Sequence, residues 1–573
     1  MLADEGLLAF DPETAVWKWD LARISSKGFT DNVADLMAGR LDRLPDMTQR
    51  AMRLFACLGN AAETATLTLI YGDAEEALHA ALWDAVRAGL VLRLETSYTF
   101  LHDRVQEAAY RLIPTDDRDE VHLNIGRVLA SRTTPAEIEE NIFEIVNQFN
   151  HGACLIHSPK ERVQVAELNL KAGRRAKAST AYASALTYFR AGRALLGEDD
   201  WEHQYRLLFD LELHQGECEL LTGELDAAEN RLSALTERAT NLVDRAAATC
   251  GRIALYNTVD RLDRAVKAGL EYLSHVGIEW SQHPTPKDVR HELEQMWEML
   301  DGRPIETLID LPLMSNPDSC ATMDVMCELL APAGFFAPNL PDLMLLRMVN
   351  LSLEHGNSDA SCFAYSSITM VLGFQFDDYQ TAFRFGQLSY DLVEKRGLDR
   401  FKARTFMHFG GMALPWVRHL SAGRSLLQRA FDAAVETGDL PPTICSSSHL
   451  ITNLIASGEP LADVQREIEA KLNFVRRTKC EHAADSITGH LALVRVLRGL
   501  TPRFASFNDA DFDEARFERH LEKGPWGGTA LCRYWIRKLQ ARFFAEENAA
   551  AVEASSRAQK LLWSWPWSVG QCR

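Results

Sequence analysis

Apolar positions recur with helical spacing over residues 46–88. Five apolar residues of the first segment share one helix face: Met47, Ala51, Leu54, Phe55 and Leu58. Asp46, with Gln49 three positions on, has the spacing of a capping box, so we expect Asp46 to cap this helix. A short helix is expected near 63–70. A strongly amphipathic helix follows over 78–86, and Gly89 ends it.

Two short apolar runs, 91–95 and 98–101, lie on either side of Thr96 and Ser97 and predict a tight β-hairpin. Asp103 then has the position of a cap for another helix. Three helices followed by a β-hairpin is the element order of a winged helix. We therefore predict a winged-helix-like domain over 31–116.

From residue 117 onward the chain has the pattern of helices almost throughout, without a convincing alternating strand pattern. Small and aromatic residues recur there at i, i+4 and i+7, at positions 185/189/192, 228/232/235, 265/269/272, 382/386/389 and 423/427/430. The first members are 43 residues apart from 185 to 228, 37 from 228 to 265, and 41 from 382 to 423. Paired helices with a period near 40 predict an α-solenoid. The pattern is tetratricopeptide-like, although looser than the strict repeat of about 34 residues. An irregular helical bundle is the alternative.

Prolines interrupt this pattern over 281–345. Because proline stops helices, we expect long connections there around two helices, 287–301 and 319–330, in an irregular helical insertion. Such an insertion either lines a binding surface or only connects its neighbours. Helical repeats are predicted on both sides of it, over 117–280 and 346–573, so the fold class is mainly α.

The charge balance argues against nucleic acid. The chain has 573 residues, with 61 Lys+Arg against 80 Asp+Glu, a formal charge of −19, and such a field repels phosphate backbones and anionic membranes. In the helix that would enter the major groove, Asp73, Glu75, Glu76 and Asp84 outnumber Arg87. We therefore expect no nucleic-acid partner and a winged helix that packs on protein.

Membrane and export signals are also missing from the sequence. The N-terminus lacks the basic and apolar regions of a signal peptide, and there is no run of about 18 apolar residues. Eleven cysteines are scattered without a Cys-x-x-Cys spacing, which favours reduced thiols. With 47% hydrophobic and 25% charged residues the composition is that of an ordinary globular protein. We expect a cytoplasmic protein with no membrane partner.

Motifs for catalysis do not occur. Without a Gly-Lys dipeptide there is no Walker A loop, and neither His-Arg-Asp nor Asp-Phe-Gly of protein kinases is present. The 17 histidines are dispersed, and no two are four positions apart as a zinc-binding pair on a helix would be. We predict no catalytic residue, no metal ligand and no enzymatic activity in this chain.

The short segment Leu101-His102-Asp103 is the best candidate for binding chemistry. A histidine at a helix N-terminus lies beside backbone N–H groups that favour anions. The simpler interpretation is that Asp103 caps the helix and His102 is a partly exposed spacer.

These three residues resemble the Met-His-Asp motif of STAND signalling ATPases, with Leu101 in place of methionine. In that family the histidine lies by the β-phosphate of bound ADP. The resemblance therefore implies an ADP-sensing role for His102 and Asp103 when the ATPase module is present.

Longer stretches resemble large bacterial sensor proteins, in which a serine/threonine-kinase-like domain precedes an AAA-type ATPase, helical repeats, a GAF domain and a histidine kinase. The similar stretches include residues 10–12, 17–21, 31–33, 56–60, 100–110, 311–314, 348–353 and 355–358. Residues 1–30 then correspond to a remnant of the ATPase module. The C-terminal residues 561–573 stop inside a repeat, so we expect a truncated array, from a fragmented gene or a reading frame cut at both ends. ATP, ADP and Mg are cofactors of the parent family, and none is expected in this chain.

The favoured hypothesis is a non-catalytic regulatory region of a STAND-type bacterial signalling protein. Its expected partners are the ATPase module of the parent protein and a protein or small-molecule effector on the helical repeats. Two alternatives remain. One is the regulatory half of a large ATP-dependent transcriptional activator, although no helix-turn-helix is visible after residue 540. The other is a stand-alone tetratricopeptide-like interaction scaffold.

Overall fold

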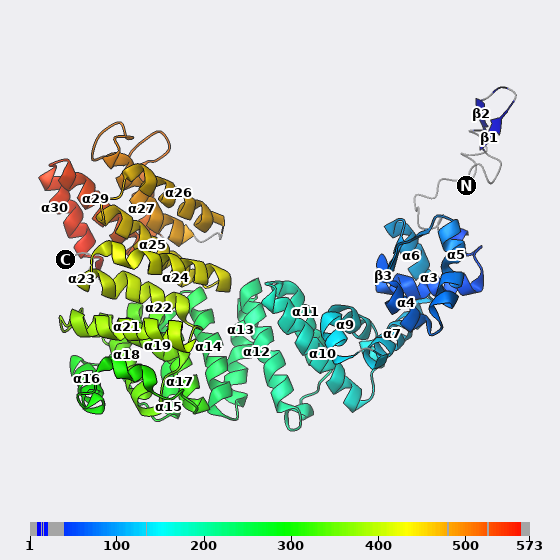
Figure 1. Ribbon diagram of the computed structural model, residues 1–573, viewed down its shortest axis with the longest axis horizontal. Helices are drawn as coiled ribbons and strands as arrows, with labels where there is room; N and C mark the ends of the chain where they lie inside the picture. Colours follow the sequence, from blue (N-terminus) through cyan, green and yellow to red (C-terminus); the bar gives the residue numbers. More distant parts are fainter. Residues whose placement is uncertain are drawn as a thin grey trace. The chain divides into compact units, whose positions relative to one another are not determined.

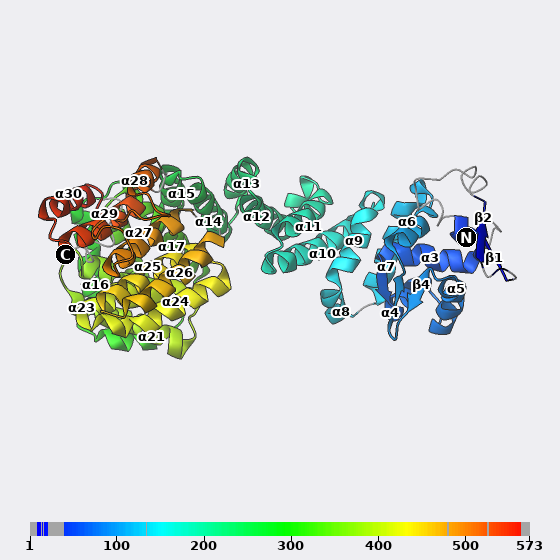
Figure 2. The ribbon, with the colours of Figure 1, turned by 90° about the horizontal axis from the view of Figure 1, so that it is seen from above.

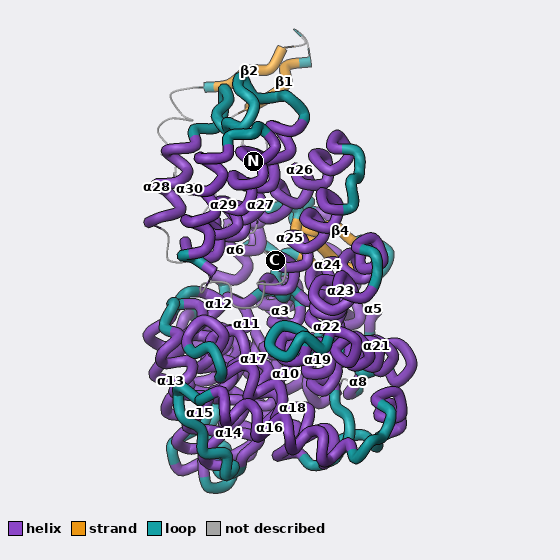
Figure 3. The backbone as a smooth tube through the Cα atoms, turned by 90° about the vertical axis from the view of Figure 1, so that its left-hand side faces the viewer, coloured by secondary structure: helices purple, strands orange, loops and turns teal. Residues whose placement is uncertain are grey.

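The computed structural model describes residues 8–12, 14, 16–20, 39–132, 134–477, 481–523 and 527–562. The chain forms two compact units, Met1–Thr222 (unit 1) and Gly223–Arg573 (unit 2). Helices make up most of both units, as the purple segments of Figure 3 show. The prediction of a mainly α fold built of stacked, paired helices is confirmed.

Unit 1 contains a hairpin, a small helix–sheet module and a series of helices. The hairpin is β1 (Leu8–Asp11) and β2 (Val16–Trp19). The module consists of α3 (Asp46–Leu58), β3 (Ala61–Glu63), α4 (Thr64–Tyr71), α5 (Glu75–Arg87), β4 (Val91–Arg93), β5 (Ser97–Phe100) and α6 (Asp103–Arg111). The following helices are α7 (Arg118–Arg132), α8 (Pro135–Glu140), α9 (Ile142–His151), α10 (Pro159–Ala178), α11 (Tyr182–Ala194) and α12 (Tyr205–Thr222), with short 3-10 turns at Thr115–Asp117, Ala153–Leu155 and Asp199–Trp201.

The module has the predicted order of three helices, a hairpin and a further helix (Figure 1). The hairpin strands β4 and β5 are joined by β3, which the sequence did not predict, into an antiparallel sheet of order β3-β5-β4. Phe55 and Phe100 stack in the core with ring centroids 4.1 Å apart, and Leu82 and Tyr98 are buried beside them. The element order is thus observed, while the winged-helix assignment itself stays a prediction.

The predicted cap of the first helix is wrong. Helix α3 begins at Asp46 itself, after Pro45, and has no side-chain cap. The side chain of Gln49 donates instead to two carbonyl oxygens of the preceding loop, at 3.2 and 3.0 Å. With Asp46 already helical, Met47 lies at the exposed start of the helix, 51% exposed, and not on the inner face.

Beyond the module, each helix of unit 1 packs on the next one or two, as Figure 2 shows for α10, α11 and α12. The predicted small–aromatic–small face of α11, Ala185, Phe189 and Gly192, is buried. A Cβ atom at Gly173 of α10 would lie 2.3 Å from the Phe189 ring. Glycine is therefore required where α10 meets α11.

The regular elements of unit 2 are all helices within its described residues. Its first half contains α13 (Leu225–Arg238), α14 (Leu242–Thr258), α15 (Leu262–His275), α16 (Pro286–Leu300), α17 (Pro317–Phe336), α18 (Leu340–His355), α19 (Asp359–Ser367), α20 (Thr369–Leu372) and α21 (Tyr379–Arg396). Its second half contains α22 (Lys402–His408), α23 (Leu414–Val417), α24 (Arg424–Thr437), α25 (Leu440–Ala456), α26 (Leu461–Arg477), α27 (Glu481–Leu497), α28 (Glu514–Lys523), α29 (Gly527–Phe544) and α30 (Asn548–Gln559). A π-helical turn, Phe409–Ala413, continues α22, and 3-10 turns occur at Ile305–Asp310 and Leu420–Gly423.

The helices in the second half of unit 2 stack on their near neighbours (Figure 1). One row contains α19, α22, α25, α27 and α29, and the helices α21, α24 and α26 pack between its members. Small residues allow the close approach that the sequence pattern predicted. A Cβ atom at Gly269 would lie 2.4 Å from Leu329, and one at Gly386 would lie 2.4 Å from Phe409.

Prolines disturb the array less than expected. Pro286 and Pro317 occupy the first turns of α16 and α17, where a missing N–H leaves no hydrogen bond unmade. The predicted helix 319–330 is longer, Pro317–Phe336, and continues through Pro332, so residues 331–336 are not a connection. An interior proline costs about 3 kcal/mol of helix stability, which the burial of α17 along most of its length offsets.

The predicted connection between α16 and α17 is packed at residues 311–314. The backbone N–H of Met314 donates to Asn357 and that of Asn357 to Pro312, both at 2.8 Å. Gly356 precedes this contact with φ +98, and a Cβ atom there would lie 2.2 Å from the Pro312 carbonyl oxygen. Only glycine satisfies both the backbone angle and the contact.

Four buried polar residues recur every 41 positions along one row of unit 2: Ser367, His408, His449 and His490. We call them the polar ladder. The hydroxyl of Ser367 and Nδ1 of His408 are 2.8 Å apart, and Nη2 of Arg537 lies 3.0 Å from Nε2 of His490. All four residues are at most 7% exposed. Each repeat of this row therefore has one buried polar side chain at the equivalent position.

Two predictions fall wholly or partly outside the described residues. The proposed ATPase remnant, 1–30, is described only for 8–12, 14 and 16–20. Of the C-terminal segment 561–573, which the sequence predicts to stop inside a repeat, only residues 561 and 562 are described.

Candidate functional site

His102 and Asp103 lie at the exposed N-terminus of α6, where the sequence placed them. The prediction that Asp103 caps this helix and that His102 is a spacer is wrong, since His102 is the N-cap. Nδ1 of His102 accepts a hydrogen bond from the backbone N–H of Arg104 at 3.1 Å. Asp103, one position too far along, is the first helical residue and stabilises the helix dipole as an acidic first-turn residue.

This cap fixes the hydrogen on the other nitrogen of the ring. Because Nδ1 of His102 accepts, the neutral imidazole carries its hydrogen on Nε2. A phosphate oxygen needs such a donor, and the α6 N-terminus adds a positive dipole end. The carboxylate of Asp103 opposes an anion, so an anion at this helix terminus would be contacted by His102 and not by Asp103.

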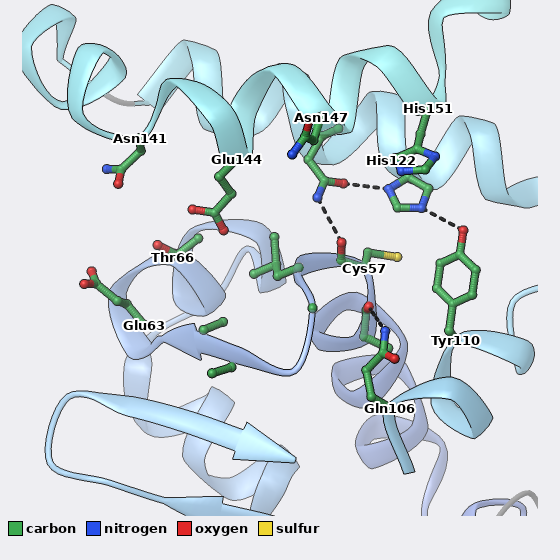
Figure 4. Close-up of a pocket in the computed structure, with 16 residues that line it drawn as sticks. Cys57, Glu63, Thr66, Gln106, Tyr110, His122, Asn141, Glu144, Asn147 and His151 are labelled. Carbon is green, nitrogen blue, oxygen red and sulfur yellow. Dashed lines mark hydrogen bonds between the residues drawn. The ribbon is translucent and has the colours of Figure 1, made fainter. Parts of the chain in front are cut away.

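The same face of α6 leads from His102 to a cavity. Gln106 and Tyr110, four and eight residues after His102, both line a hollow of about 710 Å³ (Figure 4). Its other walls come from the end of α3, strand β3, α4, α7 and α9. The cavity thus lies between the helix–sheet module and the first helices of the repeat series, all within unit 1.

A chain of hydrogen bonds crosses the inner end of this cavity. The Tyr110 hydroxyl lies 2.9 Å from Nε2 of His122, and Nδ1 of His122 lies 2.6 Å from Oε1 of Gln148. Nε2 of Gln148 donates to the Cys57 carbonyl oxygen at 2.9 Å. Because the Gln148 carbonyl oxygen can only accept, His122 donates from Nδ1 and accepts the Tyr110 hydroxyl at Nε2. These bonds link α6, α7, α9 and α3, and we call the four residues the polar relay.

Side-chain amides also satisfy the end of α3. The last carbonyl groups of a helix have no partner within the helix. Gln106 donates to the Ala56 carbonyl at 2.8 Å, as Gln148 does to that of Cys57. Gly59, with φ +118, then turns the chain into β3. The α3 terminus is therefore held by residues from α6 and α9.

Burial sets the protonation of the cavity walls. Burial lowers the pKa of His122, although the hydrogen bond to Gln148 acts in the opposite direction. The lowered pKa keeps the ring neutral. Burial raises the pKa of the Cys57 thiol to about 12, so this thiol is not a nucleophile. Burial, reinforced by the nearby Glu63 carboxylate, raises the pKa of Glu144.

The sequence did not identify the polar relay. Its members, Cys57, Tyr110, His122 and Gln148, are up to 91 residues apart, and no local motif joins them. The one available signal was spacing, because Gln106 and Tyr110 share a helix face with His102.

Among the described residues, no three His, Cys, Asp or Glu side chains come together as metal ligands would. No helix in the described part of the chain is both long and apolar enough to span a membrane.

No family model matches the chain. A curated relative is the hybrid signal transduction histidine kinase G of Dictyostelium discoideum, 25% identical over a 563-residue alignment. That alignment covers 83% of this chain and 16% of the relative, so the chain spans about one sixth of that protein's length. A similar solved structure is a STAND protein with a tetratricopeptide repeat sensor from Pyrococcus horikoshii. It has 12% identity and a TM-score of 0.42, over 91% of this chain and 67% of that one.

Over most of its length, this chain is therefore similar to one region of a signal-transduction protein.

Proposed function

We propose that this chain is the non-catalytic regulatory and interaction region of a STAND-type, ATPase-containing signal-transduction protein related to bacterial sensor kinases. The helix–sheet module acts as a winged helix that holds the ATPase module in its ADP-bound state through His102. The helical repeats bind a protein partner or a small-molecule effector and bias the change between closed and open states.

The observation that carries this proposal is the continuous polar face of α6. His102 at its N-terminus, Gln106 and Tyr110 lie on one side of a nine-residue helix. Tyr110 joins the polar relay, whose His122 and Gln148 belong to the first helices after the module. Helix α6 is thus a rigid link between His102 and the polar relay, and it couples the two sites if both bias the same two positions of the helix.

A second hollow offers a site for an effector on the repeats. It measures about 600 Å³ and lies among α24, α25 and α26 of unit 2. Arg424 donates to Glu459 at 2.7 Å on its wall, and Asp463 and Glu467 add two carboxylates. An effector would bias the protein only if it contacted this hollow differently in the two states. Coupling energies of about 1–3 kcal/mol are typical for such systems.

The release rate of fluorescent ADP from the full-length signalling protein tests the role of His102. His102→Asn keeps an N-cap acceptor, but its amide donor lies closer to the backbone than Nε2 of the imidazole, so the variant separates phosphate contact at the Nε2 position from helix capping. Losing one hydrogen bond of about 1 kcal/mol should speed ADP release about fivefold. His157→Ala, at an exposed histidine of unit 1, is the matched control and should leave release unchanged. Equal ADP release rates in His102→Asn and the wild type would refute the sensor role.

A further inference from the structure

Strand β3 has one open edge. Its partner β5 is bonded through the even-numbered positions, since Phe100 donates to the Asn60 carbonyl and Thr64 donates to the Thr96 carbonyl. Hydrogen-bonded positions alternate along an antiparallel strand, so the N–H and C=O of Ala61 and the N–H of Glu63 turn away from β5. Within the described residues no strand pairs with that side.

The open edge faces the cavity of about 710 Å³. In Figure 4 the β4–β5 hairpin lies on one side of β3, and α9 crosses above the other side. Helix α9 presents polar side chains across this gap, among them Glu144 and Asn147. A cavity of this volume falls within the range of about 300–1,000 Å³ that is usual for ligand sites. The gap is thus bounded by backbone donors and acceptors on one wall and by side chains on the other.

The charge of the cavity is one-sided. Glu63 and Glu144 supply two carboxylates, and none of the described lining residues is a lysine or an arginine. Glu144 is half-buried and lies close enough to Glu63 for the two charges to repel each other. A cation between them would relieve that repulsion and would be bound strongly for the same reason.

We propose that the open edge of β3 accepts an extended peptide segment as an additional strand, with a lysine or arginine side chain of that segment bound between Glu63 and Glu144. Addition of a strand to an exposed sheet edge is a general mode of peptide recognition, in which backbone hydrogen bonds provide affinity and pockets select side chains. The site uses the edge of β3, Glu63 of the module and Glu144 of α9, and its cavity also contains Gln106 and Tyr110 of α6. It does not use His102, so the peptide proposal does not rest on the ADP-sensing role proposed above.

A free small cation explains less of the structure than a peptide does. A polyamine would satisfy Glu63 and Glu144 but would leave the edge of β3 unused. A peptide strand uses both walls at once. Spermidine is therefore a useful probe, because binding of spermidine without binding of peptides would overturn the strand proposal.

Panning of a random octapeptide display library against the full chain tests the proposal. We expect the enriched peptides to carry a lysine or arginine flanked by residues that favour strands. Synthetic copies, measured by fluorescence anisotropy, should lose about tenfold in affinity on Glu144→Gln. Glu76→Gln, on the exposed face of α5, is the matched control and should change nothing. Enriched peptides without basic residues, or no enrichment at all, would contradict the proposal.

The strand geometry has its own test. Ala61→Pro removes the N–H at the first residue of an edge strand, where proline is tolerated, and should weaken peptide binding about fivefold. N-methylation of alternate peptide residues makes the same test without altering the protein, should Ala61→Pro fail to fold. Hydrogen exchange should show protection of residues 59–64 on peptide binding. Protection confined to other segments would show that the peptide does not add to β3.

Discussion

Gln148 uses both ends of its amide in the interior of unit 1. Its oxygen accepts from His122 and its nitrogen donates to the Cys57 carbonyl, and the residue is only 4% exposed. A buried polar group is costly only when its partner is removed. The polar relay therefore specifies how the module and the following helices meet.

Replacing Gln148 by leucine should destabilise unit 1 by about 2–4 kcal/mol, because the His122 N–H and the Cys57 carbonyl each lose a buried partner. Tyr110→Phe should cost only about 1 kcal/mol, since it removes a single bond at the cavity wall. Equilibrium urea unfolding, with hydrogen exchange to assign the transition to unit 1, measures both. Gln164→Leu, at an exposed position of α10, should stay within about 0.5 kcal/mol of the wild type. A Gln148→Leu variant as stable as this control would show that the relay contributes nothing.

For single residues, the sequence predicted where the helix N-terminus lies better than it predicted which residue caps it. Asp103 was expected to cap α6, yet His102 does so with Nδ1, because the helix begins at Asp103 itself, one residue earlier than an Asp103 cap requires. The position of a cap depends on one or two backbone angles, which periodicity does not determine. The relay was not predictable in this way, since it depends on contacts between residues far apart in sequence.

Among the elements, the row α19, α22, α25 and α27 carries the polar ladder at its centre. The period of about 40 residues was predicted from small residues, and the small faces at 185, 265 and 382 are buried as expected. The buried histidines share that period, although the sequence predicts them only as dispersed residues without a zinc-binding pair. Hydrophobic periodicity reports which face is buried, and it does not report a polar residue on that face.

The ladder predicts a loss of stability in acid. Burial lowers the pKa of His408 to about 3 and that of His449 to about 4, from about 6.5 in the unfolded chain. Between the folded-state pKa of each histidine and the unfolded-state pKa of about 6.5, the folded state therefore binds fewer protons than the unfolded state. Its stability is complete above pH ~6.5 and falls below it by up to about 1.4 kcal/mol per pH unit for each histidine.

Urea unfolding between pH 7.5 and pH ~5.5 checks this prediction, since the window lies across the unfolded pKa. His408→Gln should have a shallower slope than the wild type, whereas His291→Gln, at an exposed site on α16, should match it. Asp342 acts in the opposite sense, because burial raises its pKa to about 7, so the slopes are compared between variants. Equal slopes in His408→Gln and the wild type would contradict the assignment.

For the molecule as a whole, the charge of −19 and the acidic α5 argue against nucleic-acid binding. Helix α5 carries Glu75 and Glu76 in its first turn and Arg87 in its last. We predict that the full chain does not shift duplex DNA in a gel at physiological ionic strength. Salt-sensitive binding that disappears in Arg87→Glu would reverse this conclusion and would favour the transcriptional alternative.

Each helix of unit 2 contacts mainly its near neighbours, and the ladder residue of one repeat is replaced by its equivalent 41 positions later. In genetic terms, an in-frame loss or duplication of 41 codons joins equivalent positions to each other. Removal of residues 409–449, for example, would join His408 directly to Leu450, the residue that now follows His449. The array can thus become longer or shorter by whole repeats, and every remaining helix keeps the same kind of neighbouring helix.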